Sequence, residues 1–404
     1  MTSDTEAMVP LGTLFDIGAG KSVTPASRHG EPRYPFLRTS NVFWGRVDLT
    51  DVDAMHFTPE ELENKALKRG DLLVCEGGDI GRSAIWDGAL ERCSFQNHLH
   101  RLRPKHGEVV PLFYMYYLQA GFTQLGIYEG AGNKTTIPNL SKNRLAGLVV
   151  PAPNKHEHQR SAALLMKVQR AAQGQSEIAR TVQELKAATM RQLFTRGLRA
   201  EVLKDTELGP IPGSWNVRSS SEIFRLTSGT ARPKDISKTT NELCRIPVYG
   251  GNGVMGYSAK WMLDSSKTLV IGRVGEYCGA VHLASGKLWI TDNALFIKEW
   301  LRNDIDVEYL AHYLRYYDLN RFKRMAGQPL VTQSVIGELR LAIPMLTEQH
   351  EIAQILDAID AKIFHHNRKQ IIAQDLFNTL LCELMTDQIN VSELEIDTSE
   401  VVAC

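Results

Sequence analysis

A stretch that looks like a phosphate-binding motif stands near the start of the chain, at Gly18-Ala19-Gly20-Lys21-Ser22. A nucleotide-binding P-loop has the pattern G-x-x-x-x-G-K-[ST], in which backbone amides and the lysine hold phosphates. The first glycine of that pattern would fall at position 15, which is Phe15, and no clear buried strand precedes the motif. We therefore interpret this stretch as a polar loop and not as a nucleotide site.

Other polar side chains are flanked by glycines in residues 77–83, 249–253 and 269–276. Glycine lets a backbone approach a ligand closely, although a hairpin turn needs the same residue. Hydrogen-bonding side chains on such loops suit the edges of DNA bases. The candidates for base contact are Asp79, Arg82, Asn252 and Arg273, and the loop residues Thr39, Ser40, Asn41, Lys134 and Thr135 are further candidates for DNA contact.

A basic and aromatic strip follows in the second half of the chain, made of Arg315, Tyr316, Tyr317, Arg321, Phe322, Lys323 and Arg324. Cationic side chains of this kind bind phosphates. The alternative is a solvated helix face with a tyrosine core on its other side. We take Arg321, Lys323 and Arg324 as candidates for phosphate contact.

No catalytic or metal-binding pattern accompanies these residues. An enzyme that used residues 77–82 and 250–253 for phosphates would need a nucleophile or a base at matched positions in both halves, and we find none. The chain also shows no Asn-Pro-Pro-[Tyr/Phe] methyltransferase motif and no acidic nuclease cluster with a nearby lysine. Its six cysteines show no C-x-x-C spacing, which argues against a structural zinc and fits a reducing cytosol. We predict no catalytic residue, cofactor or metal on this chain, and a cytoplasmic location.

The composition permits several kinds of partner. A chain of 404 residues can hold two or three domains with full cores. Its 46 basic and 46 acidic residues cancel, so a nucleic-acid partner is permitted but not required. We see no signal peptide and no apolar run of about 18 residues, and therefore expect no membrane span.

A long helical stretch occurs twice, at about residues 157–198 and 348–389. A shift of 191 residues pairs Glu157 with Glu348, Leu165 with Leu356 and Leu193 with Leu384. At ~1.5 Å per residue, about 35 residues make a rod of roughly 50 Å. The net charge is +6 for residues 151–200 and −8 for residues 346–404. Opposite charges favour pairing of the two helices with each other, whereas the alternative is that each helix caps its own domain.

Both stretches show the alternating steps of four and three residues that mark a coiled-coil seam. In the first stretch the predicted seam is Leu164, Val168, Ala171, Gln175, Ile178, Val182 and Leu185. In the second it is Ile352, Leu356, Ile359, Ile363, His366, Gln370, Ala373, Phe377, Leu380 and Leu384.

The remaining segments also form two copies of one plan. A run of short strands, a glycine-flanked loop and a tyrosine-rich helix precede each long helix, and residues 207–213 carry Pro and Gly at the boundary. We predict an α+β fold with two mixed α/β recognition domains, at residues 1–155 and 201–346. The long helices, at 156–200 and 347–389, are expected to pair as an antiparallel coiled coil, and an acidic flexible tail is expected at 390–404.

A duplicated domain with a duplicated rod can act as a caliper on DNA. Each domain would read one short site on a duplex, and the paired helices would set the unread stretch between the two sites. The competing interpretation is a non-catalytic coiled-coil scaffold or adaptor that keeps the helices but does not read DNA.

The chain resembles the specificity subunits of type I restriction-modification systems over nearly its whole length. The resemblance depends on Lys68-Arg69-Gly70-Asp71-Leu72-Leu73, on Ile137-Pro138-Asn139-Leu140, and on Leu208-Gly209-Pro210-Ile211-Pro212 before Trp215. It depends also on Tyr249-Gly250-Gly251-Asn252-Gly253 before Gly256-Tyr257, and on Pro344 followed by Glu348-Gln349. The first helix departs from this pattern, because it opens with Glu157-His158-Gln159.

The resemblance implies that the chain recognises a bipartite site in double-stranded DNA and has no catalytic activity of its own. It implies as partners two methyltransferase subunits, which use S-adenosylmethionine, and restriction subunits that translocate DNA with ATP and Mg²⁺. Those cofactors are expected on the partners.

Overall fold

The computed structural model describes residues 7–128, 139–326 and 328–402. They form two compact units that share the two long helices. Unit 1 consists of residues 1–175 and 368–404, and unit 2 of residues 176–367. The expected residues Lys134 and Thr135, and Ile137-Pro138 of the family-like motif, lie outside the described residues.

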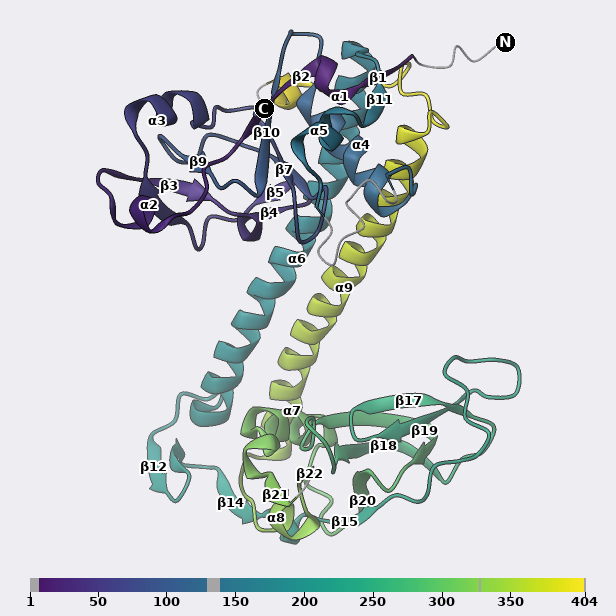
Figure 1. Cartoon of the computed structure of the whole chain (residues 1–404). Coiled ribbons are helices and arrows are strands. Elements are labelled where there is room, and N and C mark those ends of the chain that lie inside the picture. Colours follow the sequence, from purple (N-terminus) through teal and green to yellow (C-terminus); the bar gives the residue numbers. More distant parts are fainter. Residues whose placement is uncertain (1–6, 129–138, 327, 403–404) are drawn as a thin grey trace. The chain divides into compact units, whose positions relative to one another are not determined.

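The elements of unit 1 run in the order strand, short helix and mixed sheet, and end in the first long helix (Figure 1). They are β1 (Met8–Pro10), α1 (Leu11–Leu14), β2 (Phe15–Ala19), α2 (Pro25–His29), β3 (Arg33–Leu37), η1 (Thr39–Asn41), β4 (Val42–Phe43), β5 (Arg46–Val47), β6 (Asp53–His56), α3 (Pro59–Lys65), β7 (Leu72–Cys75), β8 (Ser83–Ile85), β9 (Ser94–Phe95), β10 (Leu99–Pro104), α4 (Pro111–Thr123), α5 (Lys142–Ala146), β11 (Val149–Pro151) and α6 (Lys155–Arg196).

The elements of unit 2 repeat this order after a short linker hairpin. They are β12 (Leu203–Thr206), β13 (Gly209–Pro212), β14 (Asn216–Ser219), η2 (Ser220–Glu222), β15 (Phe224–Ser228), β16 (Ile246–Gly250), β17 (Gly253–Ser258), β18 (Leu263–Gly272), β19 (Val281–Ile290), β20 (Ala294–Trp300), α7 (Val307–Tyr317), η3 (Leu319–Phe322), β21 (Arg324–Ala326), β22 (Gln328–Leu330), α8 (Gln333–Gly337), β23 (Arg340–Ile343) and α9 (Leu346–Met385). A last short helix, α10 (Ser399–Val402), belongs to unit 1. Among the described residues, no helix is long and apolar enough to span a membrane.

The two units have the same strand pairing. Unit 1 orders its main sheet β2-β10-β7-β8, and unit 2 orders the equivalent strands β15-β20-β18-β19. In unit 1, β3 joins β9 in parallel with Leu37 opposite Phe95, and in unit 2, β16 joins β19 in parallel with Tyr249 opposite Ile290. The strand that enters each unit pairs with the strand before its long helix, as β1 with β11 and β14 with β23. The internal repeat therefore extends to the topology of both sheets.

The central strand of each main sheet is buried on both faces. In β7, Leu72 and Val74 belong to the core beneath α4 and α6, whereas Leu73 and Cys75 belong to the opposite core around Trp86. Successive side chains of a strand point to opposite faces, so a strand that is covered on both sides is apolar throughout. In β18, Leu269 and Ile271 likewise belong to the core that includes the long helices, whereas Val270 belongs to the core on the opposite face of the sheet.

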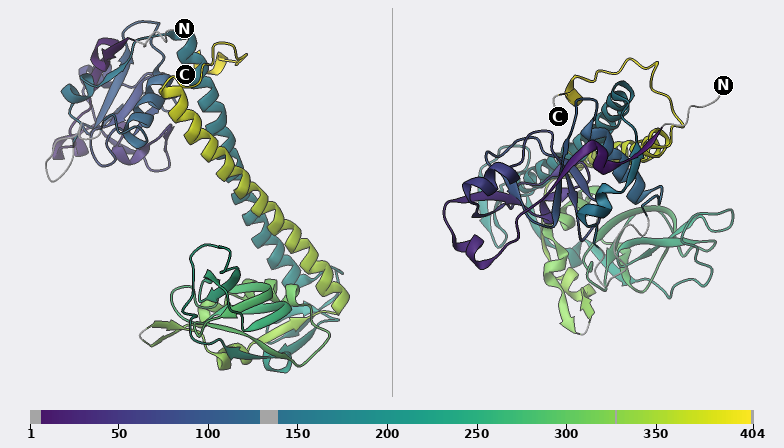
Figure 2. Two further views of the ribbon diagram at one scale, coloured as in Figure 1. Left: turned by 90° about the vertical axis from the view of Figure 1, so that its right-hand side faces the viewer. Right: turned by 45° about the horizontal axis from the view of Figure 1, so that its top comes forward.

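Both long helices complete the core of each unit. In unit 1, Leu165 and Met166 of α6 share a core with Phe377 and Leu381 near the end of α9. In unit 2, Leu193 and Phe194 at the end of α6 share a core with Ile352 and Leu356 at the start of α9. The start of one helix meets the end of the other in both cases, so the helices form an antiparallel pair, as predicted (Figures 1 and 2).

The seam of α9 is confirmed and that of α6 is partly wrong. Every predicted seam residue of α9 is buried or half-buried. In α6, Val168, Gln175 and Val182 are half-buried as expected, but Ile178 is 42% and Leu185 57% exposed. Three seam positions lie one residue later than predicted, at Ala172, Ala179 and Lys186 in place of the exposed Ala171, Ile178 and Leu185, whereas Leu164 is half-buried against the unit 1 core as predicted. Lys186 is held there by Asp360 of α9, because its Nζ lies 2.6 Å from both carboxylate oxygens.

A buried Glu-Gln pair opens α9 and ties the linker to unit 2. Glu348 accepts hydrogen bonds from the backbone N–H of Leu198 at 2.8 Å and from Trp215 Nε1 at 3.1 Å. The Gln349 side chain accepts from Asp306 N and donates to the carbonyl oxygens of Asp304 and Pro344. In unit 1 the position of Gln349 holds His158, whose ring stacks on Phe113. The departure of the first helix from the Glu-Gln pattern is therefore accompanied by an aromatic contact.

The acidic tail, which we expected to be flexible, packs on unit 1 over its described length. Val391 and Val401 are 1% and 6% exposed and belong to the unit 1 core. Arg160 of α6 donates to the carbonyl oxygen of Ser392 at 2.6 Å, and Arg170 pairs with Glu400. Acidic composition suggested a solvated tail, but apolar residues between the acids anchor it and the basic residues of α6 pair with it.

The corrected seam predicts different effects for adjacent substitutions in α6. Ala179→Glu places a carboxylate where the side chain is 4% exposed, so we expect it to lower the free energy of unfolding on the order of 2–4 kcal/mol. Ile178→Glu changes an exposed position and should shift it by less than about 0.5 kcal/mol. Urea unfolding followed by helical circular dichroism measures both. A larger cost for Ile178→Glu would restore the seam that the apolar pattern predicted.

Candidate nucleic-acid interface

Four segments meet at the same end of the main sheet in each unit, and we call this region the loop end. In unit 1 these are residues 38–41, 76–82, 96–98 and 139–140. In unit 2 they are residues 250–253, 273–280, 291–293 and 330–331. Each set is held together by backbone hydrogen bonds and isolated bridges that recur in both units.

The first loop is placed by the parallel strand pair. Gln96 N donates to Leu37 O at 2.8 Å, and Thr291 N donates to Tyr249 O at 2.9 Å. These bonds make Leu37 and Tyr249 equivalent, so Ser40 is equivalent to Asn252. Both side chains are exposed at the loop end. The structure thus brings two predicted site residues to one position of the repeated frame.

The second loop follows the buried central strand. Glu76 N donates to His98 O at 2.9 Å, and Arg273 N donates to Asn293 O at 2.9 Å. At the other end of this loop Cys75 N donates to Arg82 O, as Gly272 N does to Ala280 O. Arg273 is therefore equivalent to Glu76, and Arg82 to Ala280, although both arginines directly follow a glycine.

The side chain of Arg82 makes its contacts inside unit 1. Its Nη2 donates to Thr39 O at 2.7 Å and its Nη1 to Asp79 at 2.8 Å, and its guanidinium lies 4.9 Å from the Phe43 ring centre. The side chain is 16% exposed, whereas that of Asp79 is 75% exposed. This arrangement fits a residue that joins the first loop to the second, with Asp79 as the accessible partner.

Asn41 has a similar internal role. It is buried, its Oδ1 accepts from Arg38 N, and its Nδ2 donates to the carbonyl oxygens of Asp48 and Asp51. A side-chain amide has two donors and one acceptor oxygen, and all are engaged here. Asn41 is therefore placed to shape the loop that presents Thr39 and Ser40.

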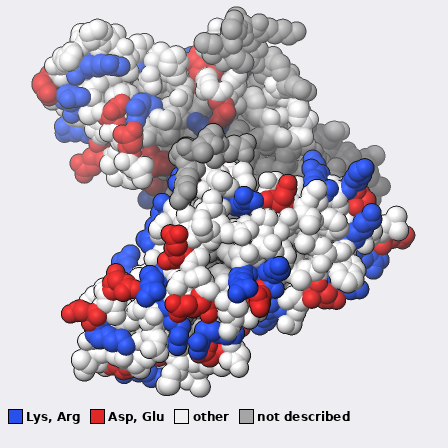
Figure 3. Space-filling model, turned by 90° about the horizontal axis from the view of Figure 1, so that it is seen from below, with Lys and Arg blue, Asp and Glu red and all other residues white. Residues whose placement is uncertain are grey.

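The basic strip of unit 2 separates into parts. Arg315 Nε donates to Val281 O, and Arg321 stacks on Tyr317 and Phe322 at 4.4 and 4.7 Å. Lys323 is exposed beside the second loop. The nearby Asn320 connects this part of the strip to the second loop, because its side chain donates to Glu276 O and Cys278 O. Arg324 begins β21, and its side chain lies outside the description. Figure 3 shows basic and acidic side chains intermixed over the faces that it draws.

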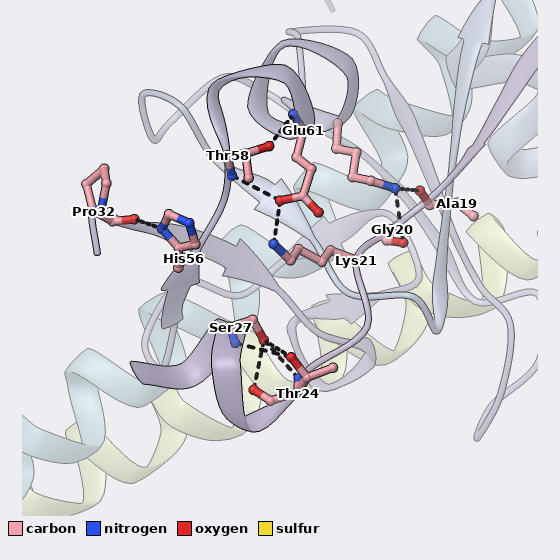
Figure 4. Close-up of polar contacts among 10 residues, drawn as sticks. Ala19, Gly20, Lys21, Thr24, Ser27, Pro32, His56, Thr58 and Glu61 are labelled. Atoms are coloured by element: carbon pink, nitrogen blue, oxygen red, sulfur yellow. Dashed lines mark hydrogen bonds and ion pairs between the residues drawn. The ribbon is translucent and has the colours of Figure 1, made fainter. Parts of the chain in front are cut away.

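The phosphate-motif look-alike runs along the sheet and pairs with it through the bridge between Lys21 and Gln96. Part of it is strand, since β2 includes Gly18 and Ala19, where we expected a loop. A Cβ on Gly20 would lie 2.2 Å from Gln96 O, and Gly229 of unit 2 has the same close approach to Ile290 O. Figure 4 shows Lys21 paired with Glu61, which also accepts from Thr58 N. Glycine is therefore required here for chain packing, and the lysine charge is balanced internally.

Two residues that we did not single out from the sequence lie at the loop end of unit 1. Glu76 has a side chain that is 17% exposed and lies 3.9 Å from His98 Nδ1. His100 Nε2 donates to Leu140 O at 2.9 Å, and burial lowers the pKa of the imidazole, which favours the neutral ring. Only the internal repeat could have indicated Glu76, as the counterpart of Arg273. Within the described part of the chain, no group of three or more His, Cys, Asp or Glu residues could hold a metal ion.

The model of the type I restriction-modification DNA specificity domain matches the chain twice, at residues 3–188 and 212–374. The chain belongs to this family. A putative MjaX specificity subunit from Methanocaldococcus jannaschii is 23% identical over 377 residues, which cover 89% of this chain and 88% of that protein. The EcoprrI specificity subunit of Escherichia coli is 29% identical over 144 residues, 35% of each chain.

A solved member of the family has the same fold. The crystal structure of the type I restriction-modification S subunit from M. genitalium matches with a TM-score of 0.67 at 17% identity, and the match covers 95% of this chain and 97% of that one. A structure from work on assembly and conformational transition of a type I system matches with a TM-score of 0.54 at 14% identity and covers 95% and 98%. The two repeated units with paired helices are thus a fold that this family uses.

In this family member, Arg82 should matter more than its neighbour Arg46, although both stack on Phe43. Arg82→Ala removes two charge-assisted hydrogen bonds from a shielded side chain and should destabilise unit 1 by about 1.5–3 kcal/mol. Arg46→Ala removes a pair with Asp48 from a side chain that is 53% exposed and should cost less than about 1 kcal/mol. Urea unfolding and amide exchange in residues 38–41 measure the difference. Equal effects would show that Arg82 does not hold the first loop.

Proposed function

We propose that this chain is the specificity subunit of a type I restriction-modification complex and that each unit reads one half of a bipartite DNA site. The supporting observation is the loop end, where one backbone frame recurs in both units with different side chains. Ser40 corresponds to Asn252, Glu76 to Arg273 and Arg82 to Ala280. A shared frame with changed hydrogen-bonding groups suits two readers of different base sequences.

The candidates for DNA contact take different roles in this proposal. Thr39, Ser40, Asp79, Asn252 and Arg273 contact bases from the loop end, and Lys134 and Thr135 lie in the segment that leads to it. Lys323, with Arg321 and Arg324, contacts phosphates. Asn41 and Arg82 position the loops. DNA contacts of the phosphate class supply affinity, whereas contacts to base edges supply specificity.

The catalytic steps belong to partner subunits in this proposal. Two methyltransferase subunits bind S-adenosylmethionine, and restriction subunits use ATP and Mg²⁺. Exposed large apolar side chains on the long helices are candidates for the surface that binds these partners. In unit 1 these include Ile371 and Ile372 of α9, 56% and 58% exposed, and in unit 2 Phe364 of the same helix, 67% exposed.

Sequencing of methylated DNA tests this function. The chain is expressed with its methyltransferase partner in cells without other DNA methylation. We expect one bipartite motif, methylated only when both proteins are present, and no methyl transfer by the purified chain alone. A non-catalytic scaffold would leave the motif of the methyltransferase unchanged when this chain is removed. That result, or methylation by this chain alone, would contradict the proposal.

We further propose that the paired helices set the length of the unread spacer. Duplication of residues 180–186 in α6 and 360–366 in α9 lengthens both helices by one heptad at facing positions, because Lys186 and Asp360 are paired. Seven residues add about 10.5 Å, which corresponds to about three base pairs of DNA. We expect methylation sequencing to show both half-sites unchanged and the spacer longer by about three base pairs. An unchanged spacer in a folded, active variant would show that the helices do not set it.

A further inference from the structure

One equivalent position of the loop end carries opposite charges in the two units. Glu76 and Arg273 each follow the last residue of the buried central strand, β7 or β18. We propose that this position reads a base in each half-site: Glu76 accepts from an exocyclic amino group of cytosine or adenine, and Arg273 donates to guanine. This inference depends on the proposed function and adds to it the class of base that each unit selects.

The backbone at this position is fixed on both sides. Glu76 N donates to His98 O at 2.9 Å, and Glu76 O accepts from Leu140 N at 2.7 Å. Arg273 N donates to Asn293 O at 2.9 Å, and Arg273 O accepts from Val331 N at 2.9 Å. Both backbone groups are therefore engaged with the neighbouring loops in each unit. The Cα is held in the same frame while the side chain is free to differ, which a base-reading position requires.

Isolated bridges place the next residue in the same way. Gly77 pairs with Asn139 in unit 1, and Val274 pairs with Leu330 in unit 2, both antiparallel. In unit 2, the Gly251 backbone also passes close by, since a Cβ on Gly251 would lie 2.8 Å from Val274 O. The residue at position 76 is thus bordered by residues 98 and 139–140, and the residue at position 273 by residues 251, 293 and 330–331.

The carboxylate of Glu76 keeps capacity to accept hydrogen bonds. Its ion pair with His98 Nδ1 has a length of 3.9 Å, beyond hydrogen-bond distance, and the side chain is only 17% exposed. A shielded carboxylate gains when an amino group of a base donates to it. Cytosine N4 and adenine N6 are the donors that bases present in the major groove.

The guanidinium of Arg273 is oriented from one side. Its Nη1 donates to Ser228 Oγ at 3.0 Å, and the same hydroxyl accepts from Gln333 Nε2 at 3.3 Å. An arginine has five N–H donors in a planar fork, so the bond to Ser228 leaves donors of this guanidinium for a further acceptor. Guanine O6 and N7 are the acceptors that arginine recognises most often.

Substitutions at the two positions test this inference, with each half-site serving as the control for the other. Glu76→Ala and Arg273→Ala are each expressed with the methyltransferase partner, and the methylated motif is sequenced. We expect Glu76→Ala to make one cytosine or adenine position of one half-site degenerate, with about a ten- to hundredfold loss of preference, because alanine offers no acceptor for the amino group. Arg273→Ala should do the same at one guanine of the other half-site. The exposed residues Glu60 and Arg225 supply matched variants, Glu60→Ala and Arg225→Ala, which should leave the motif unchanged.

Other outcomes overturn the inference. Uniform loss of methylation with an unchanged motif would show that Glu76 or Arg273 only supports the fold. A change in both half-sites from one variant would show a global effect. If the unaltered chain gives no bipartite motif, the proposed function fails, and this inference fails with it. A normal motif from the unaltered chain together with normal motifs from both variants rejects this inference alone.

Discussion

Neither unit can close its hydrophobic core without both long helices. The sheet of unit 1 rests on α4 and on the early turns of α6, and the late turns of α9 fill the remaining side. Unit 2 reverses these contributions, with the end of α6 and the start of α9. Buried apolar area is the main stabilising term in folding, so the antiparallel pairing of the helices is a condition for both recognition units. Any sequence change in a recognition unit must therefore preserve the face that meets the helices.

The exposed side chains of the loop end can vary because the cores do not include them. The shape of the loop end depends on backbone N–H and C=O groups, such as those of Glu76 and Arg273, and these groups are the same in every residue except proline. Exposed side chains such as those of Ser40 and Asn252 can change without loss of the frame, whereas Leu140 and Val331 belong to the cores. This separation of a fixed backbone from variable side chains explains how one fold can present a carboxylate in unit 1 and a guanidinium in unit 2.

The sequence was sufficient for the duplicated plan and for the two long helices, since the offset of 191 residues and the apolar periodicity report them directly. The pairing of the helices was expected from their opposite charges, and the shared cores confirm it as antiparallel. It was not sufficient for the register of α6. Seam positions in that helix hold Ala172, Ala179 and Lys186, which a search for large apolar residues passes over. Applied to these positions, the same offset pairs Ala179 with Gln370 and Lys186 with Phe377, which lie on the correctly predicted seam of α9. The 191-residue repeat therefore predicts the seam of α6 better than the size of its side chains does.

The candidate site shows a comparable limit. Arg82 and Arg273 each follow a glycine, and both were candidates for base contact. Hydrogen bonds between distant segments show that the two positions are not equivalent, and these bonds have no local signal in the sequence. The same limit applies to Asn41, whose side-chain amide is hydrogen-bonded to residues up to ten positions away.

The misassigned seam of α6 and the proposed binding of partners have one cause. A helix that packs in a pair needs one apolar stripe, and further large apolar residues outside it must either stay in water or meet another protein. Ile178 and Leu185 of α6 are of this second kind, and they made the apolar pattern of that helix ambiguous. Local rules of folding fail most often where a residue serves function. Under the proposed function, the two residues that obscured the register of α6 are therefore candidates for the surface that a partner subunit covers.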